Sequence, residues 1–228
     1  MKQITQAVIL AAGLGTRLKS FTANKPKALM SIIDEPAIVH IIRDLVRQGI
    51  HHIAINLHHH AEQIQQTLGD GSRFNAILYY SYEETLLDSG GGVRTAMELL
   101  PDDTLIAVYN ADIISNIDIQ QLAEECPEHG CALALVTNPK HNKNGDFSLD
   151  GKHIIRKAEP SYTFSGVSVW HQQVLLEKPT QQAFSLVELI QESVKQKCCL
   201  GLIHCGYWFD IGRPHDLFQA KRFMRAFS

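Results

Sequence analysis

Short apolar runs alternate with amphipathic segments along the first part of the chain, and this alternation limits the possible folds more than any other feature of the sequence. Five of the apolar runs have the length and composition of buried strands: Ala7–Ala11, Ile53–Leu57, Ala76–Tyr80, Leu105–Tyr109 and Ala132–Thr137. Four segments between them read as helices: Pro36–Gln48, Glu62–Leu68, Val93–Leu100 and Asp118–Glu125. Because strand–helix–strand order favours parallel neighbours, the sequence predicts an α/β fold with a mostly parallel central sheet flanked by helices.

The pattern changes after Asn138, where a polar loop is followed by a hairpin signal. Asp150-Gly151 predicts a type I′ turn between two short strands, and Thr163–Trp170 alternates as a further strand. Three elements are expected to follow: a helix from Ser185 to about Lys197 with a Ser185 and Glu188 capping box, a late strand over Leu200–Trp208 interrupted at Gly206, and a last helix over Pro214–Ala226. The hairpin makes the predicted sheet a mixed one.

Size and charge exclude several classes of protein. The 228 residues predict one domain, residues 1–228, because a domain typically has about 150 residues. A net charge of −3 offers no basic surface for nucleic acid or a membrane, and no apolar stretch is long enough to span a bilayer. Five cysteines, an odd number without the paired spacing of zinc sites, favour a reducing cytoplasm.

The stretch Val8–Leu29 leads a buried strand into a glycine-rich loop. Gly13 and Gly15 allow backbone N–H groups to turn toward an anion. The spacing lacks the third glycine of the dinucleotide fingerprint, and no GxxxxGK[ST] motif of a P-loop is present. Arg17 can hold phosphate oxygens through two parallel hydrogen bonds, and Lys27 can place a point charge on another phosphate.

Two motifs in this stretch, LAAGLGTRL at Leu10–Leu18 and KPKAL at Lys25–Leu29, resemble those of the nucleotidyltransferases that join a sugar 1-phosphate to an NTP. The resemblance implies the Rossmann-like nucleotide-diphospho-sugar transferase fold, with an NTP and a sugar 1-phosphate as binding partners. It implies catalytic roles for Arg17 at the triphosphate and Lys27 at the reacting α-phosphate. It also implies that further loop residues bind the nucleotide: Ala11, Ala12, Gly13, Gly15 and Thr16.

Two aspartates point to a metal ion. Asp112 follows the strand Leu105–Tyr109 directly and therefore lies at the carboxyl end of the sheet, where α/β proteins bind ligands. Far downstream, YWFDIG at Tyr207–Gly212 resembles the family's WxDxG motif, which implies that Asp210 is the second metal ligand. Two carboxylates together with phosphate oxygens and water suit Mg²⁺, which is the expected cofactor. Ala111 departs from the family's usual xGD.

The remaining site residues are assigned by the resemblance. Three residues of the LLDSGGGV stretch are expected to contact the nucleobase: Ser89, Gly90 and Gly91. The nucleotide-binding half is expected to end at about residue 137, and residues 138–228 to form the sugar-binding half. The expected substrate-binding residues are Asn110, Asp146, Glu159 and Ser165, of which Glu159 stands near a position where related enzymes carry a lysine.

Within the family, further stretches are most similar to members that use UTP and N-acetylmuramate 1-phosphate in peptidoglycan recycling, with mannose-1-phosphate guanylyltransferases next. These stretches are TLGDGSRF (67–74), NPKHNKNGDF (138–147) and TFSGVSV (163–169). Thymidylyl or uridylyl transfer to glucose 1-phosphate is a further alternative. A monomer or weak dimer is expected, and because no hexapeptide repeat follows, no C-terminal β-helix domain is expected.

Other classes of function stay open. A catalytically silent nucleotide-sugar sensor would keep the fold, although the intact Arg17, Lys27, Asp112 and Asp210 speak against it. A nicotinamide-dependent dehydrogenase is opposed by the missing third glycine. The histidine run 58–60 invites a zinc site, but adjacent residues at a strand end point in opposite directions, and no cysteine or acid cluster joins them.

Overall fold

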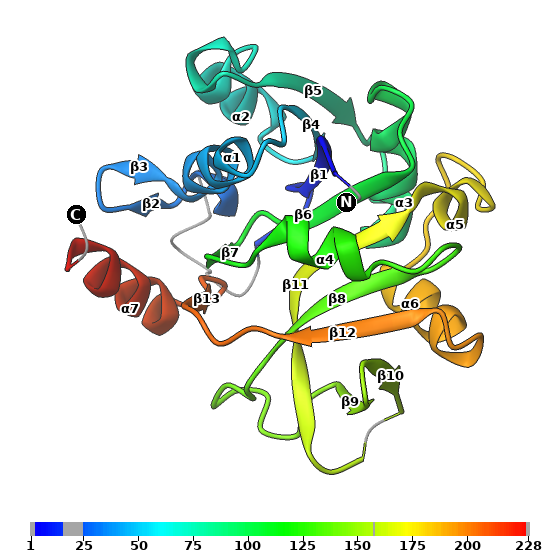
Figure 1. Ribbon diagram of the computed structural model, residues 1–228. Helices are drawn as coiled ribbons and strands as arrows, with labels where there is room; N and C mark the ends of the chain where they lie inside the picture. Colours follow the sequence, from blue (N-terminus) through cyan, green and yellow to red (C-terminus); the bar gives the residue numbers. More distant parts are fainter. Residues whose placement is uncertain (1–2, 16–24, 157, 227–228) are drawn as a thin grey trace.

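The structure is a computed structural model that describes residues 3–15, 25–156 and 158–226 (Figure 1). The strands of its central sheet are β1 (Gln6–Leu10), β4 (His52–Leu57), β5 (Ile77–Tyr82), β6 (Leu105–Asn110), β8 (Cys131–Val136), β9 (Phe147–Asp150), β10 (His153–Ile155), β11 (Ser161–His171) and β12 (Cys199–Ile203). They lie in the order β5-β4-β1-β6-β11-β8-β12-β10-β9. Two small antiparallel pairs lie outside this sheet, β2 (Ser31–Ile32) with β3 (Glu35–Pro36) and β7 (Ile113–Ser115) with β13 (Trp208–Asp210).

The sheet is mixed, as the sequence predicts. Strands β1, β4, β5 and β6 are parallel neighbours, and β8 is parallel to β12. Strand β11 runs antiparallel to both β6 and β8. The hairpin of β9 and β10 lies at the bottom of Figure 1, where β9 also pairs with the first residues of β11. The pairings of β8, β12, β10, β9 and β11 thus close into a ring in the second half of the chain.

Helices cover both faces of the sheet. Their bounds are α1 (Ala37–Arg47), α2 (Ala61–Leu68), α3 (Asp88–Ala96), α4 (Ile119–Glu125), α5 (Gln172–Leu176), α6 (Leu186–Lys195) and α7 (Pro214–Arg225). Alternate strand residues serve the two layers: Ile9 packs in the cluster that contains α1, α2, α4 and α7, whereas Val8 packs in the cluster that contains α3, α5 and α6. Alternation of this kind follows from the two-residue repeat of a strand.

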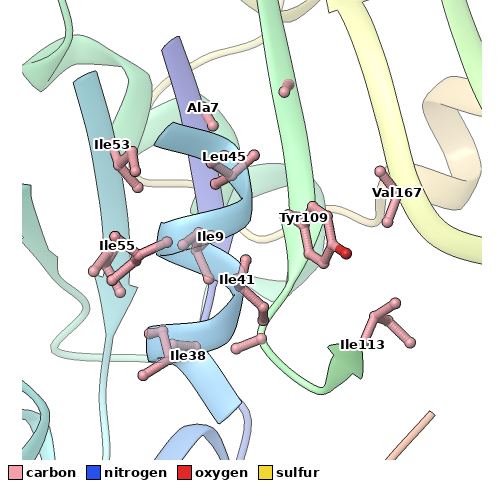
Figure 2. Close-up of a cluster of buried hydrophobic side chains, with 14 of the residues drawn as sticks. Ala7, Ile9, Ile38, Ile41, Leu45, Ile53, Ile55, Tyr109, Ile113 and Val167 are labelled. Atoms are coloured by element: carbon pink, nitrogen blue, oxygen red, sulfur yellow. The ribbon is translucent and has the colours of Figure 1, made fainter. Parts of the chain in front are cut away.

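The apolar face of α1 anchors it to the sheet. Figure 2 shows Ile38, Ile41 and Leu45 of this helix over Ile9 and Ile55 of the strands behind it. These helix residues are 0–2% exposed, and burial of each contributes about 1.5–3 kcal/mol. The anchored helix and the strands beneath it form a rigid base for the loops at the strand ends.

Helix α3 begins at Asp88, five residues before the expected start at Val93. The glycine run therefore lies inside the helix, in spite of its poor helix propensity. A Cβ atom on Gly90 would collide with the Phe184 ring, and one on Gly92 would lie 2.5 Å from Asn56 Nδ2. Close packing against neighbouring segments requires glycine here and overrides its propensity.

Three details of the second half differ from the sequence predictions. Asp150 pairs with His153, so the turn residues are Gly151 and Lys152, and of these two only Gly151 has a positive φ, of +60°. This fits a type II′ turn and corrects the predicted type I′ turn at Asp150-Gly151. The Ser185 hydroxyl caps α6 by accepting from Val187 N (3.2 Å) rather than from Glu188.

The late strand is also divided. Instead of one strand over Leu200–Trp208, β12 ends at Ile203 and β13 begins at Trp208. Gly206 lies between them with Asn116 Oδ1 in the space that a Cβ would occupy. The chain therefore leaves the central sheet at Ile203 and pairs with β7 instead, which brings the YWFDIG segment to the strand ends of the first half.

The cysteines are free thiols. Cys131 and Cys199 are partners on β8 and β12, with 3.4 Å between their Sγ atoms. Burial raises the pKa of the Cys131 thiol well above its usual value, which keeps it protonated. In the described ranges of the chain, no helix is long and apolar enough to cross a membrane.

Candidate active site

A cavity of about 690 Å³ opens at the carboxyl ends of the parallel strands, where α/β proteins bind ligands. Its lining comes from the glycine-rich loop, the strand ends and the start of α3: Leu10–Gly15, Lys27, Ala28, Asn56, Glu83, Leu86, Asp88, Ser89, Asn110–Asp112 and Gly212. Eight residues predicted for the site are among them: Ala11, Ala12, Gly13, Gly15, Lys27, Ser89, Asn110 and Asp112. Thr16, predicted to bind the nucleotide, and Arg17, predicted to lie at the triphosphate, are outside the described residues.

The backbone of the glycine-rich loop is fixed on both sides. Ala11 N and Ala12 N donate to Asn56 Oδ1 at 2.7 and 3.3 Å, and Ala111 N donates to Leu10 O at 3.1 Å. At Gly13 an added Cβ would meet nothing within 4 Å, so this residue borders open space. The loop therefore presents a rigid backbone with a glycine beside the cavity.

The small pair of β7 and β13 brings the two aspartates together. Asp210 lies opposite Ile113 in this pair, and Ile211 N donates to Asp112 O at 2.9 Å. Between the two carboxylates lies the ammonium group of Lys27, which forms an ion pair with Asp112 Oδ2 and is 4.0 Å from Asp210 Oδ1. The three side chains are only 16–22% exposed, so solvent screens their charges less than it would at the surface.

Two further contacts hold this charged group in place. Gly212 N donates to Asp210 Oδ1 at 2.8 Å, and a Cβ at Gly212 would lie 2.8 Å from Lys27 Nζ. The Tyr109 and Ser115 hydroxyls are 2.7 Å apart and connect β6 to β7. Burial raises the pKa of Tyr109 well above its usual value, so the phenol stays protonated and this link is kept.

The donor set fits a magnesium ion. Asp112 and Asp210 offer carboxylate oxygens to one point, and that point already holds a cation, the Lys27 ammonium. Across residues 3–15, 25–156 and 158–226, no group of three or more His, Cys, Asp or Glu side chains is placed to hold a metal. Mg²⁺ is typically bound by one or two carboxylates, with water and phosphate oxygens as its other ligands.

Of the three residues predicted to contact the nucleobase, the structure places one at the cavity and two away from its lining. Ser89 lines the cavity, while its hydroxyl accepts from Leu186 N at 3.0 Å. Gly90 N and Gly91 N both donate to Phe184 O, at 2.9 and 3.1 Å, and neither residue lines the cavity. The two amides therefore serve the packing of α3 in the structure.

The residues predicted to bind the sugar are more widely placed. Asn110 lines the cavity, and its side chain packs on Gly166, where an added Cβ would lie 2.6 Å from Asn110 Nδ2. Asp146 is engaged by its own loop and by β11, because its Oδ1 accepts from Asn142 Nδ2 and its Oδ2 from Phe164 N, both at 2.9 Å.

Ser165 and Glu159 are also outside the cavity lining. Ser165 is 1% exposed, and its hydroxyl accepts from Val167 N at 3.1 Å. Glu159 is exposed. The structure therefore brings only Asn110 of the four predicted substrate-binding residues to the cavity.

Several residues of the site were missed from the sequence. Asn56 and Glu83 line the cavity, and their one signal was a polar residue at the end of an apolar strand. His141 lies in the NPKHNKNGDF loop, with its Nε2 3.9 Å from Asp210 Oδ2. This distance shows that a loop of the second half reaches the aspartate pair, which no local pattern could indicate.

Comparison with known proteins identifies the family. Residues 6–226 match the nucleotidyl transferase family, and the chain therefore belongs to it. This confirms the family that the LAAGLGTRL and KPKAL motifs indicated. Transfer of a nucleotidyl group is the class of function that follows.

Particular relatives cover nearly the whole chain. The chain is 33% identical to the N-acetylmuramate alpha-1-phosphate uridylyltransferase of Neisseria meningitidis serogroup B, over 98% of this chain and 100% of the relative. It is 28% identical to the D-glycero-alpha-D-manno-heptose 1-phosphate guanylyltransferase of Campylobacter jejuni, over 94% and 97%. The solved structure of HddC from Yersinia pseudotuberculosis complexed with GMP-PN has a TM-score of 0.81 at 22% identity, over 97% of this chain and 100% of that one. These likenesses confirm the expected fold.

Proposed function

We propose that this protein transfers a uridylyl group from UTP to N-acetylmuramate 1-phosphate, giving UDP-N-acetylmuramate and pyrophosphate. The observation that carries the proposal is the convergence of Lys27, Asp112 and Asp210 at the rim of a cavity lined by the glycine-rich loop. The choice of base and sugar is supported by the Neisseria relative and by the motif resemblance. We place the reaction in the cytoplasm, as a step of peptidoglycan recycling.

In the proposed reaction, an oxygen of the sugar phosphate attacks the α-phosphorus of UTP. One phosphorus–oxygen bond forms as the bond to pyrophosphate breaks, so the protein needs no nucleophile of its own. What the chain must supply is in-line positioning and neutralisation of charge. Lys27 places its ammonium at the α-phosphate, and the backbone of Ala11–Gly15 borders the nucleotide. Arg17 is assigned to the triphosphate on the resemblance alone.

Asp112 and Asp210 are the residues that would hold Mg²⁺. When bound, the ion neutralises phosphate charge and so supplies Lewis-acid stabilisation. Lys27 lies between the same two carboxylates and supplies a fixed positive charge at the same place. Among the described residues, the lining includes three acidic residues, Glu83, Asp88 and Asp112, and one lysine, so Mg²⁺ and Arg17 would add positive charge where the triphosphate binds.

Support for the substrate contacts is uneven. Ser89 and Asn110 are placed at the cavity and are proposed to contact the nucleoside and the sugar phosphate. Base contacts by Gly90 and Gly91, and sugar contacts by Asp146, Glu159 and Ser165, are supported by the resemblance and by no contact in the structure.

The decisive experiment follows pyrophosphate release by purified protein with Mg²⁺. Five nucleotides, UTP, dTTP, GTP, CTP and ATP, are each combined with the 1-phosphates of N-acetylmuramate, N-acetylglucosamine, glucose and mannose. The proposal predicts a clear preference for UTP with N-acetylmuramate 1-phosphate. A Lys27→Met preparation controls for contaminating activity, and Lys221→Met, on α7 and outside the cavity lining, controls for the loss of one lysine.

Other outcomes have distinct meanings. Another preferred pair, such as GTP with a mannose or heptose 1-phosphate, would retain the reaction and refute the proposed substrates. Nucleotide binding without pyrophosphate release from any pair would instead favour a nucleotide-sugar sensor.

A further inference from the structure

A buried hydrogen-bond chain connects the ends of three neighbouring strands in the wall of the cavity. Asn56, at the end of β4, accepts from the backbone of Ala11 and Ala12 through Oδ1. Its Nδ2 donates to Glu83 Oε1 at 2.7 Å, and Glu83 Oε2 accepts from Leu87 N at 3.0 Å. Asn56 is 3% exposed and Glu83 is 6% exposed, so water does not replace these bonds readily.

The direction of each bond in the chain is fixed by chemistry. The backbone amides of Ala11 and Ala12 can only donate, so the oxygen of Asn56 must face them. The amide nitrogen of Asn56 then faces Glu83, whose carboxylate accepts there and also from Leu87 N. The donors therefore point to Glu83 from both ends, from the glycine-rich loop through Asn56 and from Leu87 N at the start of α3, and an exchange of an acceptor for a donor at any point leaves a buried group unsatisfied.

Gly92 shows that the position of this chain is tightly set. A Cβ on Gly92 would lie 2.5 Å from Asn56 Nδ2 and 2.7 Å from Glu83 Oε1. Helix α3 therefore packs directly on the bond between the two side chains. With the helix on one side and the loop on the other, neither side chain can move without moving one of them.

From these contacts we propose that Asn56 and Glu83 are positioning residues that fix the glycine-rich loop in its nucleotide-binding form. The inference rests on the proposed function, because it takes the cavity beside Ala11–Gly15 as the nucleotide site. A displaced Ala11 or Ala12 would move the amides that follow them in the loop, and small displacements of positioning groups have large effects on binding and rate. The two residues act through the loop and need no contact with the reacting atoms.

An exchange of polarity tests the proposal. In Asn56→Asp, an oxygen still accepts from Ala11 and Ala12, but two carboxylates then face each other. In Glu83→Gln, the side-chain oxygen can accept from Leu87 N, but its amide nitrogen then faces the donor Nδ2 of Asn56. The double variant Asn56→Asp/Glu83→Gln restores every bond with the middle one reversed, because the amide nitrogen introduced at position 83 donates to the carboxylate introduced at position 56. The pair keeps its single negative charge.

The readout is the Kd of UTP with Mg²⁺, measured by calorimetry, with GTP measured in parallel. Each single substitution should raise this Kd about tenfold or more, since bonds to a charged buried group are involved. The double variant should return to within about threefold of the wild type. Thermal unfolding is measured for each variant, and KM for the sugar phosphate should change less than the Kd of the nucleotide.

Ser168→Ala is the matched control for a lost buried hydrogen bond. Ser168 is 1% exposed and its hydroxyl accepts from Trp170 Nε1 at 2.8 Å, in the sheet interior and outside the cavity lining. This variant should lower the Tm and leave the nucleotide Kd unchanged. If the single substitutions at Asn56 and Glu83 behave in the same way, the residues are structural only and the proposal is wrong.

Failure of the double variant to recover nucleotide affinity, whether or not it folds, also overturns the proposal. This result is separable from the proposed function. Absence of turnover with every sugar 1-phosphate contradicts the function, whereas the Kd series for whichever of UTP and GTP the wild type binds concerns the loop alone.

Discussion

The two sides of the site are built by different means. On the side proposed to bind the nucleotide, four parallel strands, β5, β4, β1 and β6, end at one edge of the sheet, and most of the cavity lining comes from their ends and from the segments that follow them. On the other side, the loop of residues 138–146 is held by bonds among its own side chains and β11. Thr163 Oγ1 donates to Asn138 Oδ1 at 2.9 Å, and Asn142 Nδ2 donates to Asp146.

This difference shows at which positions a polar residue in the sequence indicates a ligand-binding site. At the end of a buried parallel strand, place in the sequence fixes place in space, so Asn110 and Asp112 could be located at the cavity in advance. In an irregular loop the backbone N–H and C=O groups have few partners in helices or sheets. Polar side chains such as Asp146 then form hydrogen bonds with these groups. A polar residue there is as well explained by its own loop as by a substrate.

The largest expected effect is at Lys27 and tests the nucleotide side. Lys27→Met removes the charge and keeps much of the side-chain volume. We expect kcat/KM to fall about a thousandfold or more, equivalent to about 4 kcal/mol of transition-state stabilisation. The measurement is steady-state pyrophosphate release, with Lys221→Met as the control. A variant within tenfold of the wild type would show that the charge between the aspartates is not used in the reaction.

The aspartate pair is expected to have the next largest effect. In Asp112→Asn and Asp210→Asn the proposed metal site loses one charged oxygen ligand. Each substitution should lower kcat about a hundredfold and raise the Mg²⁺ concentration needed for half-maximal activity about tenfold, because the two residues bind as a unit. A magnesium titration makes the measurement, and Asp102→Asn, an exposed aspartate in a loop, is the control. An unchanged magnesium dependence in either variant would refute the assignment of that ligand.

The same distinction between strand ends and irregular loops explains which parts of the fold and of the site could be predicted from the sequence. The strands, the sheet and the places of Lys27, Asn110 and Asp112 were predictable, because apolar runs and motifs are local. Asp210 could be assigned only by resemblance, since its partner strand β7 lies far away in the sequence. Its approach to Asp112 depends on the turn away from the sheet after Ile203.

The glycine run shows a second limit. Its three residues look like a loop that approaches a base, yet Gly90, Gly91 and Gly92 are in a helix and are packed against protein atoms. A glycine signals close approach, but the sequence does not say whether protein or ligand is close. The Asn56 and Glu83 pair was hidden for a similar reason, because its hydrogen bonds connect the ends of three different strands, β1, β4 and β5.

A smaller effect is expected at Gly212, where the segment after β13 contacts the charged group. In Gly212→Ala the Cβ would lie 2.7 Å from Asp210 Oδ1 and 2.8 Å from Lys27 Nζ, so one of these atoms must move. We expect kcat/KM to fall about tenfold, since a shift of a few tenths of an ångström misplaces the charges. Gly69→Ala is the control: its φ of +65° makes alanine strained, but open space surrounds the Cβ. That control should lower the Tm alone, and equal activities in the two variants would contradict the prediction.

The smallest effect is expected on the other side, at Asp146, and it decides whether the two sides truly differ. Asp146 and Asn142 are the two ends of one hydrogen bond, so if Asp146 serves the loop, Asp146→Asn and Asn142→Ala should act alike. Each should lower stability by about 1 kcal/mol and raise KM for the sugar phosphate only a few fold, with kcat nearly unchanged. Paired measurements of Tm and KM test this. A rise in KM above tenfold in Asp146→Asn, with Asn142→Ala near the wild type, would instead show that the carboxylate touches the substrate, and the loop would then present its polar residues as the strand ends do.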